Sequence, residues 1–319
     1  TQYKSKQKLN LNMVAADAHH VAPAHSHMPL VFMLVLTQMA VGISAVNALL
    51  PLAALRDQMP DVHKVLGALA LGIGVAGLNC ALLHLGRPLY AFRAFLGYKT
   101  SWLSREIIAF SLFLGAASAY AGSLFLPLSV TASVQNALSA SSAGAGILGV
   151  FCSMMIYIDT RREFWSAPFT VIKFGLSTVL PGAAGSLAAI AVLAHSGSAA
   201  GAALMKFAEP FAAAFLLASL IKLVSEMSVL SNTSESTFMP LEKSAIIMLQ
   251  HSGVATSLRF ICGFSACVLA LILVANKTNA EFGMPLAISL AALALAGELL
   301  ERYLYFRAVV ALKMPGSVM

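Results

Sequence analysis

The stretch Cys80–Phe110 reads CALLHLGRPLYAFRAFLGYKTSWLSREIIAF, and the organisation of the whole chain can be worked out from it. An apolar run ends in LLHLG, which contains His84. A short aromatic and basic loop follows, and SREI, which contains Glu106, opens a second apolar run. A histidine and a carboxylate therefore lie at facing ends of two hydrophobic segments, near one surface. This arrangement is suited to exchanging protons beside an apolar ligand.

The composition is that of a membrane protein. Of the 319 residues, 59% are hydrophobic and only 10% are charged, whereas soluble domains carry about 25% charged residues. The charges separate long apolar stretches, and about 20 apolar residues are needed to span a bilayer. We therefore predict an all-α, polytopic membrane protein without a soluble domain.

Eight hydrophobic segments predict eight transmembrane helices packed in a bundle. They run near residues 29–54, 62–85, 103–126, 131–158, 168–194, 200–228, 253–275 and 284–308. Residues 29–319 would form one transmembrane domain. Residues 1–28 are polar and basic and show no periodicity, so we predict an extended arm that contacts a partner subunit.

The distribution of basic residues predicts the orientation of the protein. Eight spans place both termini on one side, and sixteen of the 20 Lys and Arg residues then fall on that side, against four on the other. Short loops rich in Lys and Arg remain in the cytoplasm. We therefore predict a multi-pass protein of the cell's inner (cytoplasmic) membrane with both termini cytoplasmic.

Polar residues inside the spans gather in one half of the membrane. Charged groups are costly there, so they indicate a function or a compensating partner. A polar pocket in one leaflet with apolar walls suits a quinone, because the head group needs hydrogen bonds and proton exchange while the tail needs lipid. We predict a site for menaquinone or ubiquinone made of Gln38, His84, Arg87, Ser104, Glu106, Tyr157 and Lys173.

Within this set, His84 and Glu106 are the predicted catalytic residues. Imidazole passes protons near neutral pH, and a carboxylate at a helix start could carry a proton away. The structural alternatives are that His84 caps the second span and that Glu106 is a carboxylate favoured by the helix dipole. Glu298 and Arg302, spaced i,i+4 in the last span, predict a structural ion pair.

The sequence predicts neither a metal nor a haem in this protein. Its four cysteines lie inside apolar runs without a CxxC motif, as is typical of buried packing residues. Bis-histidine haem needs intramembrane histidines paired at matched depth. His195 falls at the opposite surface and His251 in a loop.

The stretch LLHLGRPLYAFRAFLGYKTSWLSREI resembles the signature of the membrane anchor subunits of dimethyl sulfoxide reductase-type molybdenum enzymes. It is more distantly similar to the polysulfide reductase membrane subunit superfamily. HMPLVFMLVLTQMAVG in the first span, the segment 157–174 and AGELLER in the last span agree in order, so the resemblance covers about residues 27–310.

This resemblance implies an eight-helix, haem-free anchor that holds a four-cluster iron–sulfur subunit and a molybdopterin catalytic subunit. Such an anchor exchanges electrons with the quinone pool in anaerobic respiration. It implies that His84 and Glu106 are quinol-site residues and that the clusters and molybdopterin belong to the partners.

The basic arm and the predicted orientation differ from the enterobacterial members. A cytoplasmic catalytic module fits sulfite-oxidising relatives better, in which the anchor would reduce quinone. Quinol oxidation that feeds a reductase remains an alternative. Two other classes also remain open, a proton-linked transporter that uses Lys206 and Glu209, and a tether without quinone chemistry.

Overall fold

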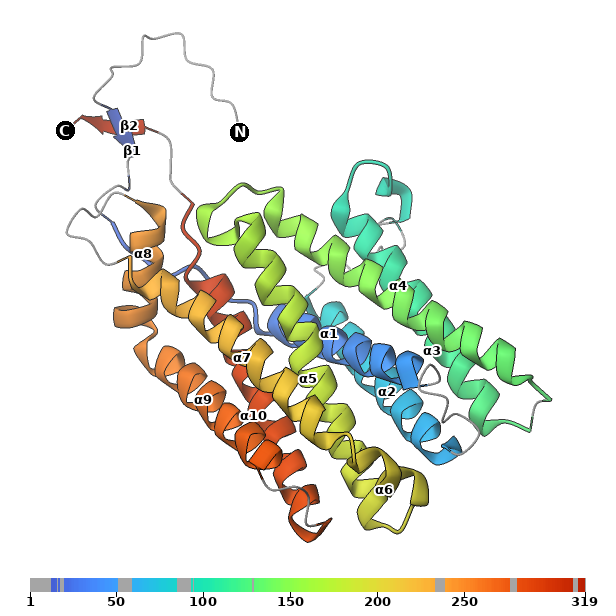
Figure 1. The fold of residues 1–319 in the computed structure, drawn as a ribbon. Coiled ribbons are helices and arrows are strands. Elements are labelled where there is room, and N and C mark those ends of the chain that lie inside the picture. The colour runs from blue at the N-terminus through green and yellow to red at the C-terminus, as the bar shows by residue number, and fades with distance from the viewer. Residues whose placement is uncertain are drawn as a thin grey trace.

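A computed structural model describes residues 13–15, 17, 20–50, 59–84, 93, 95–127, 129–232, 239–275, 280–311 and 315–318. It confirms the predicted all-α architecture, since long helices packed side by side make up almost all of the molecule (Figure 1). Two short strands outside the helical bundle are the exception.

Among the described residues, eight helices are long and apolar enough to cross a membrane, and together they match the eight predicted spans. They are α1 (Met28–Leu49), α2 (Pro60–His84), α3 (Trp102–Phe125), α4 (Ala132–Ile158), α5 (Ala167–His195), α7 (Ala208–Leu230), α9 (Gly253–Ala275) and α10 (Ala280–Arg307). The shorter elements are β1 (Met13–Ala15), the 3-10 turn η4 (Glu163–Trp165), α6 (Ala199–Met205), α8 (Pro240–Ile246), the π-helical turn η5 (Ile247–His251) and β2 (Pro315–Val318).

Successive membrane-spanning helices run in opposite directions, so the bundle has two distinct ends. We call the arm side the end at which α1, α3, α5 and α9 begin and α2, α4, α7 and α10 end. The opposite end is the far side. His84 and Glu106 both belong to arm-side ends of their helices.

The sixth predicted segment, 200–228, is divided in the structure. The short helix α6 ends at Met205, and α7 begins at Ala208. Pro210 explains the break, because it has no N–H to donate to the carbonyl of Lys206 and its ring would clash with that carbonyl in a continuous helix. Of these two helices, α7 is the one long and apolar enough to cross a membrane.

Helices α1 and α5 lie at the centre and cross in very close contact. A Cβ atom added to Gly42 would lie 2.1 Å from the carbonyl oxygen of Thr178, and one added to Gly182 would lie 2.5 Å from the Cα of Gly42. Only residues without a side chain allow this approach, as is common where membrane helices pack tightly. The crossing brings α1 against α5 and α10, where the buried charges lie.

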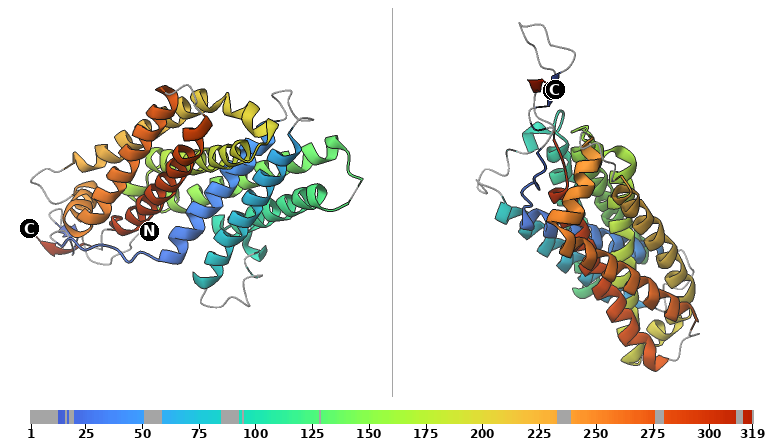
Figure 2. Two further views of the ribbon diagram at one scale, coloured as in Figure 1. Left: turned by 90° about the horizontal axis from the view of Figure 1, so that it is seen from below. Right: turned by 90° about the vertical axis from the view of Figure 1, so that its left-hand side faces the viewer.

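The described part of the arm is held by the protein's own helices. Strand β1 pairs antiparallel with β2 outside the bundle (Figure 2). Lys243 Nζ donates to the carbonyl oxygens of Asp17 and His20 at 2.6 and 3.3 Å, and the amide of Ala24 donates to the carbonyl of Arg307 at 2.9 Å. Contact of the arm with a partner subunit stays a prediction.

Candidate functional site

Glu106 is a buried carboxylate near the arm-side surface. Ser101 caps α3 by accepting a hydrogen bond from the Ser104 amide at 3.4 Å, which fixes the start of the helix. Glu106 follows within the next turn and is only 4% exposed. Ser153 of α4 donates its hydroxyl hydrogen to the Glu106 carboxylate. The predicted proton-exchanging carboxylate therefore has one defined partner on a neighbouring helix.

The structure describes part of the histidine motif. Helix α2 ends at His84, so the backbone of this residue lies at the arm side, as predicted. Its side chain and the whole of Arg87 lie outside the described residues. Ser104 is buried in the first turn of α3 beside Gly97. Its predicted role in binding quinone stays a prediction.

A second polar cluster lies in the arm-side half of α5, α7, α9 and α10. We call it the charge network, and its members are Lys173, Lys222, Glu226, Arg259, Glu298, Glu301 and Arg302. All seven side chains are at most 5% exposed. Four cations and three carboxylates leave one formal positive charge in excess within this network.

Lys222 of α7 joins the helices of the network. Its ammonium contacts the Glu298 carboxylate of α10 and donates to the hydroxyl of Ser177 at 2.7 Å and to the carbonyl of Lys173 at 3.1 Å. All three ammonium hydrogens thus have acceptors. Arg259 of α9 holds Glu226 with two hydrogen bonds of 2.8 and 2.9 Å. Such satisfied geometry is what makes buried ion pairs tolerable in an apolar interior.

The predicted ion pair between Glu298 and Arg302 is replaced by other contacts. Among the described residues, Glu298 pairs with Lys222 and Arg259, while Arg302 lies 3.7 Å from Glu301. Ser177 lies between the predicted partners, since it donates to Glu298 and accepts from Arg302 at 3.0 Å. Residues spaced i,i+4 share a helix face, but here each side chain reaches a partner on another element or the adjacent residue.

Lys173, a member of the charge network, and Gln38, which contacts the network, are both predicted to bind quinone. Arg302 donates to the side-chain oxygen of Gln38 at 3.2 Å. Lys173 Nζ lies 3.4 Å from Glu301 and 4.5 Å from the ring centre of Phe164. The interactions of these two side chains are therefore with α10 and η4, whereas the Glu106 side chain contacts α4. The predicted polar pocket divides into two parts.

Aromatic side chains lie between the two parts. Tyr157, one helical turn after Ser153 on α4, packs with its ring centre 5.5 Å from those of Phe174 and Tyr305. The guanidinium of Arg302 lies 3.8 Å from the ring centre of Phe174. Tyr157, the remaining predicted quinone ligand, thus connects the Glu106 region to the charge network through ring contacts.

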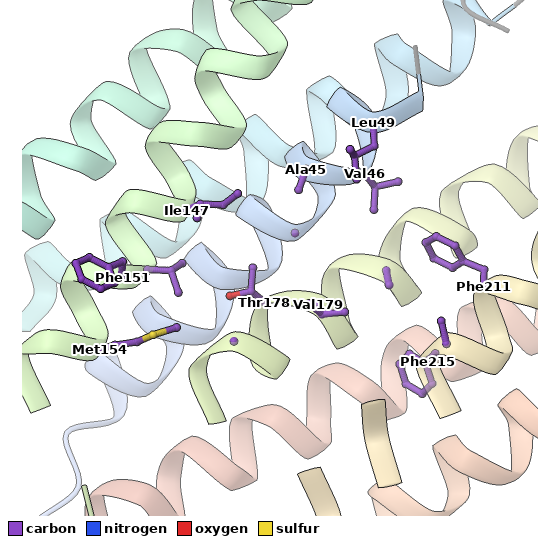
Figure 3. A pocket seen from close by; sticks show the side chains of 15 residues that line it. Ala45, Val46, Leu49, Ile147, Phe151, Met154, Thr178, Val179, Phe211 and Phe215 are labelled. Atoms are coloured by element: carbon purple, nitrogen blue, oxygen red, sulfur yellow. The ribbon is translucent and has the colours of Figure 1, made fainter. Parts of the chain in front are cut away.

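An apolar groove runs along the bundle between α1, α4, α5 and α7. Its volume is about 530 Å³, and its walls include Val46, Phe151, Val179 and Phe211 (Figure 3). Met154, the neighbour of Ser153 in sequence, lines it as well. The groove lies at the depth of the spans and suits a hydrocarbon chain.

Sequence reasoning missed several polar residues, among them Lys222, which joins the helices of the charge network. Ser153, Ser177 and Glu301 all hold a charged side chain, yet none was singled out. Spacing offered a signal for two of them, because Ser177 lies four residues after Lys173 and Glu301 three after Glu298. Ser153 had no such signal. Among the described residues, no group of three or more His, Cys, Asp or Glu side chains is arranged to hold a metal ion.

Comparisons with known proteins find a family that covers most of this protein and three similar relatives. A family model described as the DMSO reductase anchor subunit (DmsC) matches residues 23–307. A sulfite dehydrogenase subunit of Allochromatium vinosum is 32% identical over 167 residues, which are 48% of this protein and 48% of the relative.

Two reductase subunits are also similar. One, from an anaerobic dimethyl sulfoxide reductase of Haemophilus influenzae, is 30% identical over 156 residues, 49% of this protein and 55% of the relative. The other is YnfH, from an anaerobic dimethyl sulfoxide reductase of Escherichia coli, which is 30% identical over 159 residues, 48% and 54% of the two sequences. In these alignments the protein spans about half the length of the curated relatives it matches.

Proposed function

Because the chain belongs to the family of DMSO reductase anchor subunits, we propose that it is the quinone-reactive membrane anchor of an oxidoreductase complex. Its partners would be a molybdopterin catalytic subunit and a four-cluster iron–sulfur subunit, which would carry all of the complex's metal cofactors. The anchor would pass electrons between the quinone pool and those clusters.

The buried Glu106 carboxylate carries this proposal. It lies at the arm side of α3, held by Ser153, and the loop before α3 follows directly from the His84 end of α2. A bound quinone supplies two-electron chemistry that consumes or releases two protons. Glu106 and His84 would exchange these protons with the arm-side compartment, since both lie at helix ends on that side.

The residues present fit such a ligand. A quinone joins a polar ring to a long apolar chain, and the apolar groove offers walls for that chain beside α4. His84, Arg87, Ser104 and Glu106 would surround the head group. Gln38, Tyr157 and Lys173, whose described contacts are with α10 and the aromatic side chains, would support the site from behind.

We propose that electrons flow from the partner subunits to quinone. The bias of sixteen basic residues to four favours a cytoplasmic arm side in the inner membrane. A cytoplasmic catalytic module suits oxidation of a cytoplasmic substrate, and one relative is named as a sulfite dehydrogenase subunit. The opposite direction, with quinol oxidised to feed a reductase, is the second candidate, because two relatives are named as parts of reductases.

A proton-linked transporter has less support. Lys206 and Glu209 are exposed at the far side. The far half of α5, α7, α9 and α10 is packed with apolar residues such as Leu187, Phe215 and Leu290. Among the described residues, no polar relay joins Lys206 and Glu209 to the charge network.

The proposal is tested with His84→Ala and Glu106→Gln in the assembled complex. Both variants are expected to abolish turnover with a quinone while turnover of the partner with a soluble dye persists. Glu209→Gln, which changes an exposed far-side carboxylate, is the matched control and should retain both activities. Normal quinone-linked turnover in both variants would exclude this site. A complex purified in mild detergent without molybdenum or iron would exclude the predicted partners.

A further inference from the structure

A second cavity opens at the arm side, away from Glu106. Its volume is about 650 Å³, and it lies where η5 meets the first turns of α9, next to the last turns of α10 and the start of α1. Gln250, His251, Ser252 and Tyr303 give it polar atoms, while residues such as Val254 and Leu258 give it an apolar wall. None of the residues that line this cavity belongs to the quinone site proposed above.

An arginine outside the lining contacts the polar part of the cavity. Arg307 donates from Nε to the hydroxyl of Ser252 at 3.0 Å, and its guanidinium lies 5.6 Å from the ring centre of Tyr303. Since Ser252 and Tyr303 both line the cavity, Arg307 is fixed against its rim. His251 is exposed beside it. None of the lining residues is Asp or Glu, so the rim suits an anion.

The apolar part continues along the membrane-facing surface of α9. Val254 and Leu258 are one helical turn apart and are 78% and 44% exposed. Leu299 and Leu300 of α10 form the adjoining wall. The basic rim lies at the arm-side end of two membrane spans, and the apolar wall extends from it into the depth of the membrane.

We propose that this cavity binds a phospholipid with an anionic head group. The phosphate would accept hydrogen bonds from the Arg307 guanidinium, whose planar donors match phosphate geometry. An acyl chain would lie on Val254 and Leu258. Anionic lipid heads are attracted to basic residues at the cytoplasmic surface of a membrane, and the charge of the rim complements them.

Such a lipid would brace the arm. The backbone carbonyl of Arg307 accepts the Ala24 amide at 2.9 Å, and Met28, the first residue of α1, lines the same cavity. Fixing the Arg307 side chain from the membrane would therefore stabilise the point at which the arm joins the bundle. This inference does not depend on the chemistry proposed for Glu106.

The test measures lipid binding to the purified complex. Phosphatidylglycerol or phosphatidylethanolamine is added, and native mass spectrometry detects the bound lipid. The wild type is expected to retain one phosphatidylglycerol in preference to phosphatidylethanolamine. Arg307→Gln should weaken this binding about tenfold, in keeping with the loss of a charge-assisted hydrogen bond. Arg161→Gln, which removes an exposed arginine at the same membrane surface, is the matched control and should bind normally.

A second variant keeps the test independent of the arginine's structural role. Val254→Asp places a negative charge on the exposed wall without disturbing a buried contact, and it should also lower phosphatidylglycerol binding. Equal binding by Arg307→Gln, Val254→Asp and Arg161→Gln would overturn the proposal. So would one-for-one displacement of the lipid by a quinone analogue, since the cavity would then belong to the quinone.

Discussion

Lys222 on α7 contacts Glu298 on α10, and neither side chain is more than 2% exposed. This pair joins two membrane helices through opposite charges in an apolar interior. With Ser177 on α5 as a common neighbour, it ties three helices together at one depth. The charge network thus connects the helices of the arm-side half. The aromatic rings of Tyr157, Phe174 and Tyr305 lie between it and the proposed site at Glu106.

Lys222→Met is expected to destabilise the protein by about 3–5 kcal/mol, because it leaves the Glu298 carboxylate buried without its ammonium partner. Thermal unfolding of the purified protein in detergent measures the change. Lys206→Met replaces an exposed lysine and should change stability by no more than about 0.5 kcal/mol. Equal melting temperatures for the two variants would show that the network does not stabilise the fold.

Ser153→Ala should lower quinone-linked turnover about tenfold while dye-linked turnover remains normal. The hydroxyl of Ser153 holds the Glu106 carboxylate, and a hydrogen bond to a charged group contributes about 1.5–3 kcal/mol. Ser123→Ala is the control, since the Ser123 hydroxyl bonds the Tyr120 carbonyl of its own helix at 2.7 Å. A normal rate in Ser153→Ala would mean that the orientation of Glu106 does not matter.

Gly42→Ala is expected to destabilise the bundle by about 1–3 kcal/mol, because the new methyl group forces α1 away from α5. Gly144→Ala is the matched control within α4. A Cβ atom there meets nothing within 4 Å, so this variant should be neutral or slightly stabilising. Denaturant or thermal unfolding in detergent compares the two, and a stable Gly42→Ala protein would contradict the close crossing.

Lys243→Ala should release the described part of the arm, because its ammonium bonds the carbonyls of Asp17 and His20. Hydrogen–deuterium exchange at the Ala24 amide is expected to accelerate as its bond to Arg307 opens more often. Lys99→Ala, which removes an exposed lysine of the same side, should leave this exchange unchanged. Unchanged exchange in Lys243→Ala would show that other contacts hold the arm.

The lengths of the apolar stretches in the sequence were enough to locate the membrane helices, without any knowledge of the tertiary structure. A helix in lipid satisfies its own backbone hydrogen bonds, so each apolar stretch of sufficient length defines a span by itself. Among the described residues, the segment near Pro210 is divided into two helices, and its proline accounts for the division. The motif around His84 and Glu106 placed both residues at the arm side for the same reason, since they mark where apolar segments end and begin.

Tertiary structure decided which polar groups meet. The sequence places Glu298 and Arg302 on one helix face, yet Glu298 bonds Lys222 from another helix. A buried charged side chain pairs with an opposite charge that helix packing places near it. The spacing of residues along one helix does not show which residues of other helices lie near. Ser153 and Ser186 are both buried serines in spans, and each bonds a carbonyl of its own helix, but Ser153 also holds Glu106. Only the contact between α3 and α4 distinguishes them.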